Sequence, residues 1–234
     1  MGLLSKRLAA AAELVPDGSV LLDIGTDHGY LPIALLKENR IPSALAFDVR
    51  EGPLQAAKEH ILEAGLDSRI ILRLSDGFEA LKYGEADTVT ILGMGGGLIR
   101  RILNDGDPNS LGIRECILGP QSEQKELRSY LTGNGYQIRQ ECYVRDSGKF
   151  YVLIRAVFGE ETPYSEQELL FGRSALQAKD PVLFQYLTHR ETVLRNILSH
   201  LPENPAGELR KEELEEELAL VTGCIATYDH AGTA

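Results

Sequence analysis

The 234-residue sequence lacks tryptophan and has only three cysteines, Cys116, Cys142 and Cys224. It contains no Cys-x-x-Cys pair and no His/Cys cluster, so it predicts neither a zinc site nor a disulfide framework. No run of about 18 apolar residues occurs, which argues against a membrane-spanning helix. The segment Met1–Lys6 resembles neither a signal peptide nor a myristoylation signal. We therefore expect a cytoplasmic protein with no metal and no membrane partner.

Positive charge is also scarce, because 24 Lys and Arg against 35 Asp and Glu give a net charge of −11. This balance disfavours a protein that coats nucleic acid nonspecifically. Residues 161–234 hold 6 of the basic and 13 of the acidic residues, which leaves 18 and 22 for residues 1–160. A local basic face on the first part of the chain remains compatible with the overall charge.

The first 160 residues alternate short apolar runs with helical patterns, which predicts βαβ units and a parallel sheet. The expected parallel strands are Val20–Ile24, Ala44–Asp48, Ile70–Leu74, Ala86–Leu92 and Arg114–Leu118. Two further β-rich runs, Tyr136–Val144 and Phe150–Phe158, flank a short polar segment with a glycine and predict an antiparallel hairpin. The expected fold class is α/β, with a doubly wound, Rossmann-like sheet of parallel strands closed by that hairpin.

Residues 161–234 read as a second, entirely helical domain. Ser165 and Glu168 form a capping-box pattern, and Asp180-Pro181 and Asn204-Pro205 are typical helix starts. Apolar residues recur at coiled-coil spacing and predict an antiparallel helical hairpin joined near Pro202; they are Leu183, Leu187, Leu194, Leu198, Leu201, Leu214, Leu218, Val221 and Ile225. This coiled-coil-like hairpin is either an RNA-gripping arm or an element for homo-oligomerisation, and its acidity argues against broad phosphate contact.

A glycine-containing loop follows the first expected strand, with Asp23, Gly25, Thr26, Asp27 and Gly29. Glycines here allow a ligand to approach the backbone, and the next helix offers free N–H groups. The dinucleotide fingerprint G-x-G-x-x-G is missing, and the two acidic residues would repel a pyrophosphate. Acidic groups suit a cationic ligand, so the loop favours S-adenosylmethionine over NAD.

Two more acidic residues lie at the carboxyl ends of successive strands, where open α/β sheets bind their ligands. Asp48, with Val49 beside it, is placed to accept the hydroxyl groups of a ribose, although a carboxylate there can also cap the next helix. Asp76, with Gly77 beside it, is placed to accept a hydrogen bond from an adenine amino group, although a simple turn would also explain it. Together with the first loop, these residues predict the cofactor site.

Glycines also dominate the segment after the fourth strand, Gly93-Met94-Gly95-Gly96-Gly97. This run lies beside the point where the order of the strands is expected to reverse. We expect an open backbone surface there, on which a target base could form hydrogen bonds with main-chain groups. A flexible turn is the alternative interpretation.

The motif Asp23-x-Gly25-x-Asp27-x-Gly29 resembles the first motif of class I S-adenosylmethionine-dependent methyltransferases. A more specific resemblance, to the bacterial tRNA adenine-N1 methyltransferase family that modifies position 22 in the D-arm, is carried by DIGTDHGYLP, FDVREGPLQAAK, SDGFEAL and GMGGGLI. It covers the whole chain and implies S-adenosylmethionine as cofactor and tRNA as partner. The chain departs from the generic pattern by having Asp27 where a glycine is usual, which matches this family.

The segment after the fourth strand also bears on which atom of the base is methylated. Many amino-methyltransferases have an Asn/Asp-Pro-Pro-aromatic segment that accepts protons from an exocyclic amine, and here Gly93, Met94 and Gly95 stand in its place. A ring nitrogen needs no such acceptor, because its lone pair is free. We expect Asp27 to stabilise the positive charge that passes to the base, His28 to contact the base and Tyr30 to stack on it. The alternative for His28 is a structural hydrogen bond that holds the loop, and the alternative for Tyr30 is packing of the helix; the sequence supports these roles equally well.

Basic residues around the cleft are expected to contact RNA; they are Lys6, Arg7, Arg100, Arg101, Arg145 and Lys149. Ordinary solvated charges are the alternative for each of them singly. Three other functions compete with tRNA methylation: a methyltransferase of a small metabolite, a non-catalytic S-adenosylmethionine-binding module, and, least supported, an NAD-dependent enzyme.

Overall fold

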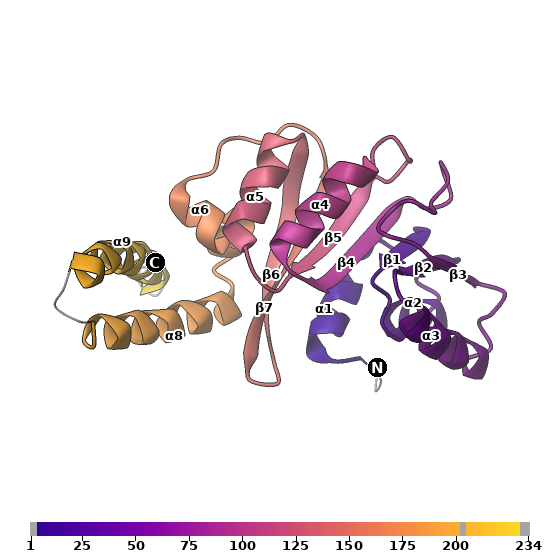
Figure 1. The fold of residues 1–234 in the computed structure, drawn as a ribbon, viewed down its shortest axis with the longest axis horizontal. Helices are drawn as coiled ribbons and strands as arrows, with labels where there is room; N and C mark the ends of the chain where they lie inside the picture. Colours follow the sequence, from indigo (N-terminus) through magenta and orange to yellow (C-terminus); the bar gives the residue numbers. More distant parts are fainter. Residues whose placement is uncertain (1–3, 202–204, 230–234) are drawn as a thin grey trace. The chain divides into compact units, whose positions relative to one another are not determined.

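The computed structural model describes residues 4–201 and 205–229 (Figure 1). The chain divides into two compact units, Met1–Pro163 and Tyr164–Ala234. The first is called the sheet unit here, and the second the helical unit. Among the described residues, no helix combines the length and the apolar character that crossing a bilayer requires, and no cluster of candidate metal ligands occurs.

A seven-stranded sheet forms the centre of the sheet unit, in the order β3-β2-β1-β4-β5-β7-β6. Its strands are β1 (Leu21–Ile24), β2 (Ala44–Asp48), β3 (Ile70–Leu74), β4 (Thr88–Met94), β5 (Glu115–Pro120), β6 (Tyr136–Asp146) and β7 (Lys149–Phe158). The first five pair in parallel, and β7 pairs antiparallel with both β5 and β6. The predicted parallel sheet with a closing antiparallel hairpin is confirmed.

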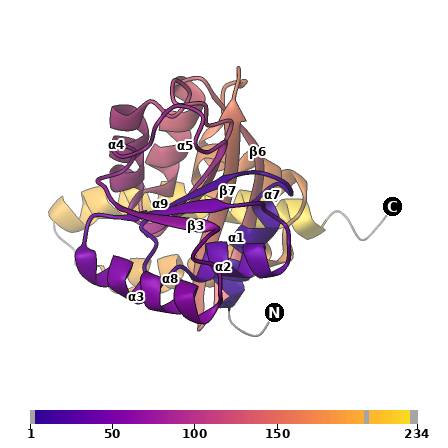
Figure 2. The ribbon, with the colours of Figure 1, turned by 90° about the vertical axis from the view of Figure 1, so that its right-hand side faces the viewer.

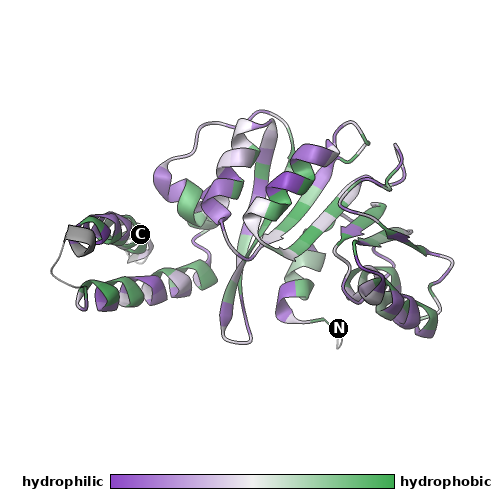
Figure 3. Ribbon diagram, viewed as in Figure 1, coloured by the Kyte–Doolittle hydropathy of each residue, from purple (hydrophilic) through white to green (hydrophobic). Residues whose placement is uncertain are grey.

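Helices cover both faces of this sheet (Figures 1 and 2). One face carries α1 (Lys6–Leu14), α2 (Tyr30–Lys37) and α3 (Glu51–Glu63), and the other carries α4 (Gly96–Gly106) and α5 (Gln124–Gly133). The central strands are largely hydrophobic (Figure 3), and β1 is buried at every residue. The apolar run of β3 is different, because this strand lies at an edge of the sheet and leaves Ile71 and Leu74 exposed.

The helical unit contains α6 (Glu166–Phe171), α7 (Arg173–Gln177), α8 (Pro181–Leu198) and α9 (Pro205–Asp229). Ser165 and Glu168 form the predicted capping box, and Asp180 caps α8 by accepting from Val182 and Leu183. The Tyr228 hydroxyl near the end of α9 donates to the carbonyl oxygen of Asp180 at the start of α8 (3.2 Å), so the two helices run antiparallel, as expected.

The apolar stripes of the helical hairpin are buried in part. Leu183, Leu187, Leu194, Leu214 and Val221 are buried, as is Cys224, whereas the other residues of the predicted stripes are half-buried. The expected joint near Pro202 and the helix-starting residue Asn204 lie outside the described residues.

Candidate active site

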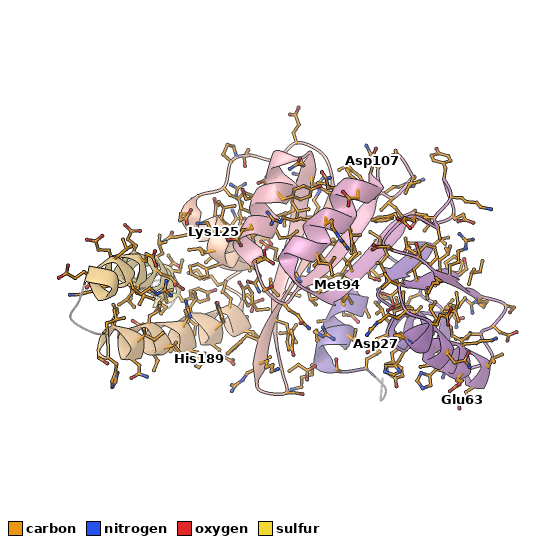
Figure 4. The ribbon with its side chains drawn as sticks, viewed as in Figure 1. Asp27, Glu63, Met94, Asp107, Lys125 and His189 are labelled. Carbon is orange, nitrogen blue, oxygen red and sulfur yellow. The ribbon has the colours of Figure 1, made fainter. Side chains whose placement is uncertain are left out.

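A cavity of 420 Å³ opens at the carboxyl ends of the parallel strands. It lies beside β1 and β4, where the strand order reverses, which is where open α/β sheets bind ligands. Figure 4 labels Asp27 and Met94 at this edge of the sheet, and Asp107 at the opposite edge. The cavity is lined by Arg7, Leu8, Asp23, Gly25, Thr26, Asp27, His28, Gly29, Tyr30, Leu31, Asp48, Arg50, Leu92, Gly93, Met94 and Gln121.

The loop after β1 is fixed by its own backbone. The N–H groups of Gly25 and Thr26 both donate to the carbonyl oxygen of Phe47 at the end of β2, at 2.8 and 3.1 Å. Gly25 has a φ of +79°, and a Cβ there would collide with the side chain of Met94. The left-handed backbone conformation therefore favours glycine at this position, and a larger residue would also have to displace the end of the Met94 side chain.

Two buried carboxylates stand at the ends of β1 and β2. Asp23 Oδ1 accepts a hydrogen bond from the Thr90 hydroxyl at 2.6 Å. Burial raises the pKa of the Asp23 carboxyl above its usual range, and the hydrogen bond from Thr90 opposes that rise. Asp48 Oδ1 accepts from the backbone N–H of Arg50 at 2.9 Å. Both side chains line the cavity, so a cationic ligand would meet acidic groups there.

Three aromatic rings are stacked at the cavity. The ring of Tyr30 lies 5.0 Å from that of His60 and 5.2 Å from that of His28, nearly parallel to both. His60 Nδ1 lies 3.0 Å from the carbonyl oxygen of His28, so α3 holds the loop that carries His28. Asp27 Oδ2 lies 3.7 Å from His28 Nε2, and the Asp27 side chain is 72% exposed. The cluster places the predicted base-contacting residues together.

The glycine run after β4 is less open than the sequence suggested. Met94 still belongs to β4, Gly95 is the N-cap of α4, and α4 begins at Gly96. A Cβ at Gly96 would approach the carbonyl oxygens of Ser122 and Glu123 to 2.7 and 2.6 Å. The expectation of an open surface across the run is therefore wrong: Gly93 and Met94 line the cavity, whereas Gly96 packs against the loop after β5.

The predicted adenine-binding residues Asp76 and Gly77 do not line this cavity. They line a second one of 330 Å³, beside α4, and Asp76 Oδ2 lies 3.7 Å from Arg101 Nη2. Val49 is exposed and lines neither cavity. The assignment of these three residues to a cofactor stays a prediction.

The six predicted RNA-binding residues separate into two groups. Arg7 lines the cavity, and Lys6, Arg145 and Lys149 are exposed on α1 and on the β6–β7 hairpin. Arg100 and Arg101 lie on α4, where Arg100 Nη2 is 4.0 Å from Glu123 Oε1 and Arg101 faces Asp76. No pattern in the sequence distinguishes these two groups.

The cavity also contains side chains that sequence reasoning missed. Gln121 directly follows β5 and Arg50 follows β2, so the rule that ligands bind at the carboxyl ends of strands could have found both. Leu8 on α1 and the neighbouring His60 on α3 gave no such signal, because each comes to the site by the packing of its helix.

The lining fits S-adenosylmethionine. The volume lies in the range of small-molecule sites, and the acidic groups suit a ligand with sulfonium and ammonium charges. His28 Nδ1 is buried without a hydrogen-bond partner among the described residues, which leaves a polar group for a bound molecule.

Comparison with known proteins assigns the family. A protein family described as "Methyltransferase domain" matches residues 4–154. The curated tRNA (adenine(22)-N(1))-methyltransferase of Bacillus subtilis (strain 168) is 34% identical over 218 residues, which covers 91% of this chain and 92% of that protein. This chain belongs to the bacterial tRNA (adenine(22)-N1)-methyltransferase family.

Solved structures of family members agree with this assignment. A Streptococcus pneumoniae protein solved in complex with S-adenosyl-L-methionine has a TM-score of 0.86 and 32% identity, covering 95% of this chain and 99% of its own. M. capricolum TrmK, solved with S-adenosyl-homocysteine, has a TM-score of 0.83 and 29% identity, and the match covers 96% of this chain and 98% of that one. The chain is an S-adenosylmethionine-dependent methyltransferase with the Rossmann-like fold of these enzymes.

Proposed function

We propose that this enzyme transfers a methyl group from S-adenosylmethionine to N1 of adenine 22 in the D-arm of tRNA. The observation that carries the proposal is the 34% identity, over nearly the full length of both chains, to the tRNA (adenine(22)-N(1))-methyltransferase of Bacillus subtilis. The cavity at the strand-order reversal, with its acidic lining, supports it. Cytoplasmic location and self-association through α8 and α9 remain predictions.

The residues of the cavity divide into two proposed roles. Asp23, Asp48 and the backbone from Gly25 to Gly29 hold the cofactor, which supplies an electrophilic methyl group on a sulfonium. Arg50, whose N–H fixes the Asp48 carboxylate, orients that group toward the cavity.

Asp27 and the ring cluster form the base-binding side. Adenine N1 attacks with its free lone pair, the N–C bond forms as the C–S bond breaks, and the positive charge passes to the base. The Asp27 carboxylate stabilises that charge, and Tyr30, whose ring lies beside those of His28 and His60, provides a flat surface for the base. Because N1 lies on the Watson–Crick edge, a paired adenine has to be extruded first.

The test is an incubation of the purified protein with unmodified tRNA and labelled S-adenosylmethionine, followed by digestion and identification of the methylated nucleoside. We expect 1-methyladenosine, and no product with a matched tRNA that has guanosine at position 22. Binding of S-adenosylmethionine without transfer to any tRNA would overturn the proposal and favour a metabolite methyltransferase or a binding module.

A further inference from the structure

The β6–β7 hairpin extends beyond the sheet on the side of the active site. β7 pairs with β5 only from Ile154 to Val157, whereas its pairing with β6 continues to Lys149. Because β7 runs antiparallel to β5, residues 149–153 continue past the last β5 residue paired with β7, Leu118, toward the carboxyl edge of the sheet. Figure 1 shows the end of the hairpin projecting past the neighbouring strands.

Helix α1 is anchored to this projecting end beside the cavity. The backbone N–H of Arg7 donates to Asp146 Oδ2 at 3.2 Å, and this bond lowers the pKa of the Asp146 carboxyl. The Arg7 guanidinium lies 5.3 Å from the ring centroid of Tyr151, and Arg7 lines the cavity beside Gly93. Arg7 therefore contacts the hairpin and also lines the active-site cavity.

Three of the four cations on this surface are exposed, and Arg7 is half-buried. The Arg145 guanidinium lies 5.5 Å from the ring centroid of Phe150, so two arginines here lie over aromatic rings. Stacking over a ring restricts a guanidinium and leaves its N–H groups available in a planar fork that suits phosphate oxygens. Lys6 and Lys149 are exposed nearby. Within the described part of the chain, none of these four side chains forms an ion pair.

We propose that this surface, called the hairpin surface and made of Lys6, Arg7, Arg145, Lys149, Phe150 and Tyr151, binds the phosphate backbone of the RNA strand that carries the target adenine. The inference rests on the proposed function and assigns the RNA contact to the hairpin side of the active site. Arg100 and Arg101 on α4 face Glu123 and Asp76 instead, so their charge is already partly balanced.

The test compares two double substitutions in the full-length chain, each of which removes two exposed cations. Arg145→Ala with Lys149→Ala changes the hairpin surface, and Arg210→Ala with Lys211→Ala is the matched control on α9. The dissociation constant for unmodified tRNA is measured at several salt concentrations, together with the dissociation constant for S-adenosylmethionine and the melting temperature.

In the hairpin variant we expect the affinity for tRNA to fall on the order of tenfold at 0.15 M salt. The slope of log K against log salt should become shallower by about 2, because two phosphate contacts are lost. Affinity for S-adenosylmethionine and the melting temperature should stay at the wild-type values, and the α9 variant should keep both the tRNA affinity and the slope.

A second pair of variants tests the aromatic support. Tyr151→Ala removes the ring over which Arg7 lies, whereas Tyr151→Phe keeps it. We expect tRNA affinity to fall in the first and to persist in the second. If the Arg145→Ala, Lys149→Ala enzyme keeps the wild-type tRNA affinity and salt slope, this inference is overturned and the proposed function is not affected. A wild-type chain that neither binds nor methylates tRNA would overturn the proposed function and this inference with it.

Discussion

The sheet unit and the helical unit each contain an Arg–Glu ion pair of the same length in opposite environments. In the sheet unit, Arg128 Nε lies 2.6 Å from Glu141 Oε1, and both side chains are fully buried. In the helical unit, Arg190 Nε lies 2.6 Å from Glu217 Oε1, but the side chains are 32% and 28% exposed. Although the two pairs have the same length, removing one partner should destabilise the protein more in the first pair. Only there is the remaining charge buried.

The location of each pair explains the difference. Arg128 lies on α5 and Glu141 on the edge strand β6, so their bond ties a covering helix to the sheet. Burial opposes the charge of Arg128, but the neighbouring Glu141 keeps the pKa of the guanidinium raised. Arg190 and Glu217 join α8 to α9 at a partly solvated face, where water can replace either partner.

The largest expected effect comes from breaking the buried pair. Arg128→Met should lower the free energy of unfolding by about 3–5 kcal/mol, because Glu141 loses its partner inside the protein. Arg190→Met should lower it by only about 0–1 kcal/mol. Urea denaturation followed by circular dichroism measures both, and equal losses would contradict the comparison. The double variant Arg128→Met, Glu141→Leu should recover most of the lost stability.

The next largest effect concerns catalysis in the sheet unit. Asp27→Asn removes the carboxylate that stabilises the charge on the base, so we expect kcat to fall about 100-fold. Affinity for S-adenosylmethionine should change by less than about twofold, since a group that acts only in the transition state does not alter binding of the ground state. Single-turnover methyl transfer at saturating tRNA measures this, and a full rate would remove Asp27 from the mechanism.

The same chemical change at Asp48 should have a different effect. Asp48→Asn removes a buried carboxylate at the end of β2, and hydrogen bonds to charged groups contribute about 1.5–3 kcal/mol. We therefore expect affinity for S-adenosylmethionine, measured by calorimetry, to fall at least about tenfold. Unchanged affinity would show that Asp48 acts only by holding the backbone N–H of Arg50 ahead of α3.

A smaller effect is expected at His60. His60→Ala removes its ring contact with Tyr30 and the contact with the His28 carbonyl oxygen, together about 1–2 kcal/mol of positioning. If that loss falls on the transition state, kcat decreases about tenfold. Affinity for S-adenosylmethionine should persist. Steady-state kinetics measures kcat, and thermal denaturation measures the melting temperature. If the substitution lowers the melting temperature and leaves kcat unchanged, His60 has a purely structural role.

The smallest expected effect is on the pH dependence of stability, and it is the same in the two units. The partners Arg73 and Arg173 lower the pKa of Glu85 and of Glu168 from 4.5 to about 2. A lowered pKa in the folded state stabilises the protein above pH 4.5, and that contribution is lost as the pH falls from 4.5 to 2. The free energy of unfolding should therefore decrease less between pH 4.5 and pH 2 in the Glu85→Gln or Glu168→Gln variant than in the wild type. We expect the difference to be less than about 1 kcal/mol for each variant. Acid titrations of stability at fixed salt measure the difference.

Most of the fold could be predicted from local patterns. Continuous apolar runs such as that of β1 indicate buried parallel strands, and the polar segment between β6 and β7 indicates a hairpin. The capping box of Ser165 and Glu168 fixes the start of α6 within the sequence itself. The exposure of β3 could not be predicted, because an edge position depends on the order of the strands and not on the strand's own residues.

Part of the candidate site could also be predicted from the sequence, and part could not. Residues at the carboxyl end of a strand, such as Asp48, were found because the carboxyl ends of parallel strands meet at one edge. Asp76 also follows a strand, yet it lines a different cavity, since the loop after β3 turns toward α4. Arg7 was expected near the cleft as one of several basic residues, and the contact of α1 with the hairpin places it at the cavity wall.

By itself, the sequence determined the succession of strands and helices along the chain, the loop from Asp23 to Gly29 and the resemblance to the methyltransferase family. These features depend on neighbouring residues, so they can be read without knowing the fold. Only the tertiary structure decided that His60 supports Tyr30 and that Arg7 joins the hairpin to the cavity. Such contacts join residues far apart in the chain, and they exist only because helices pack on a sheet of one particular order.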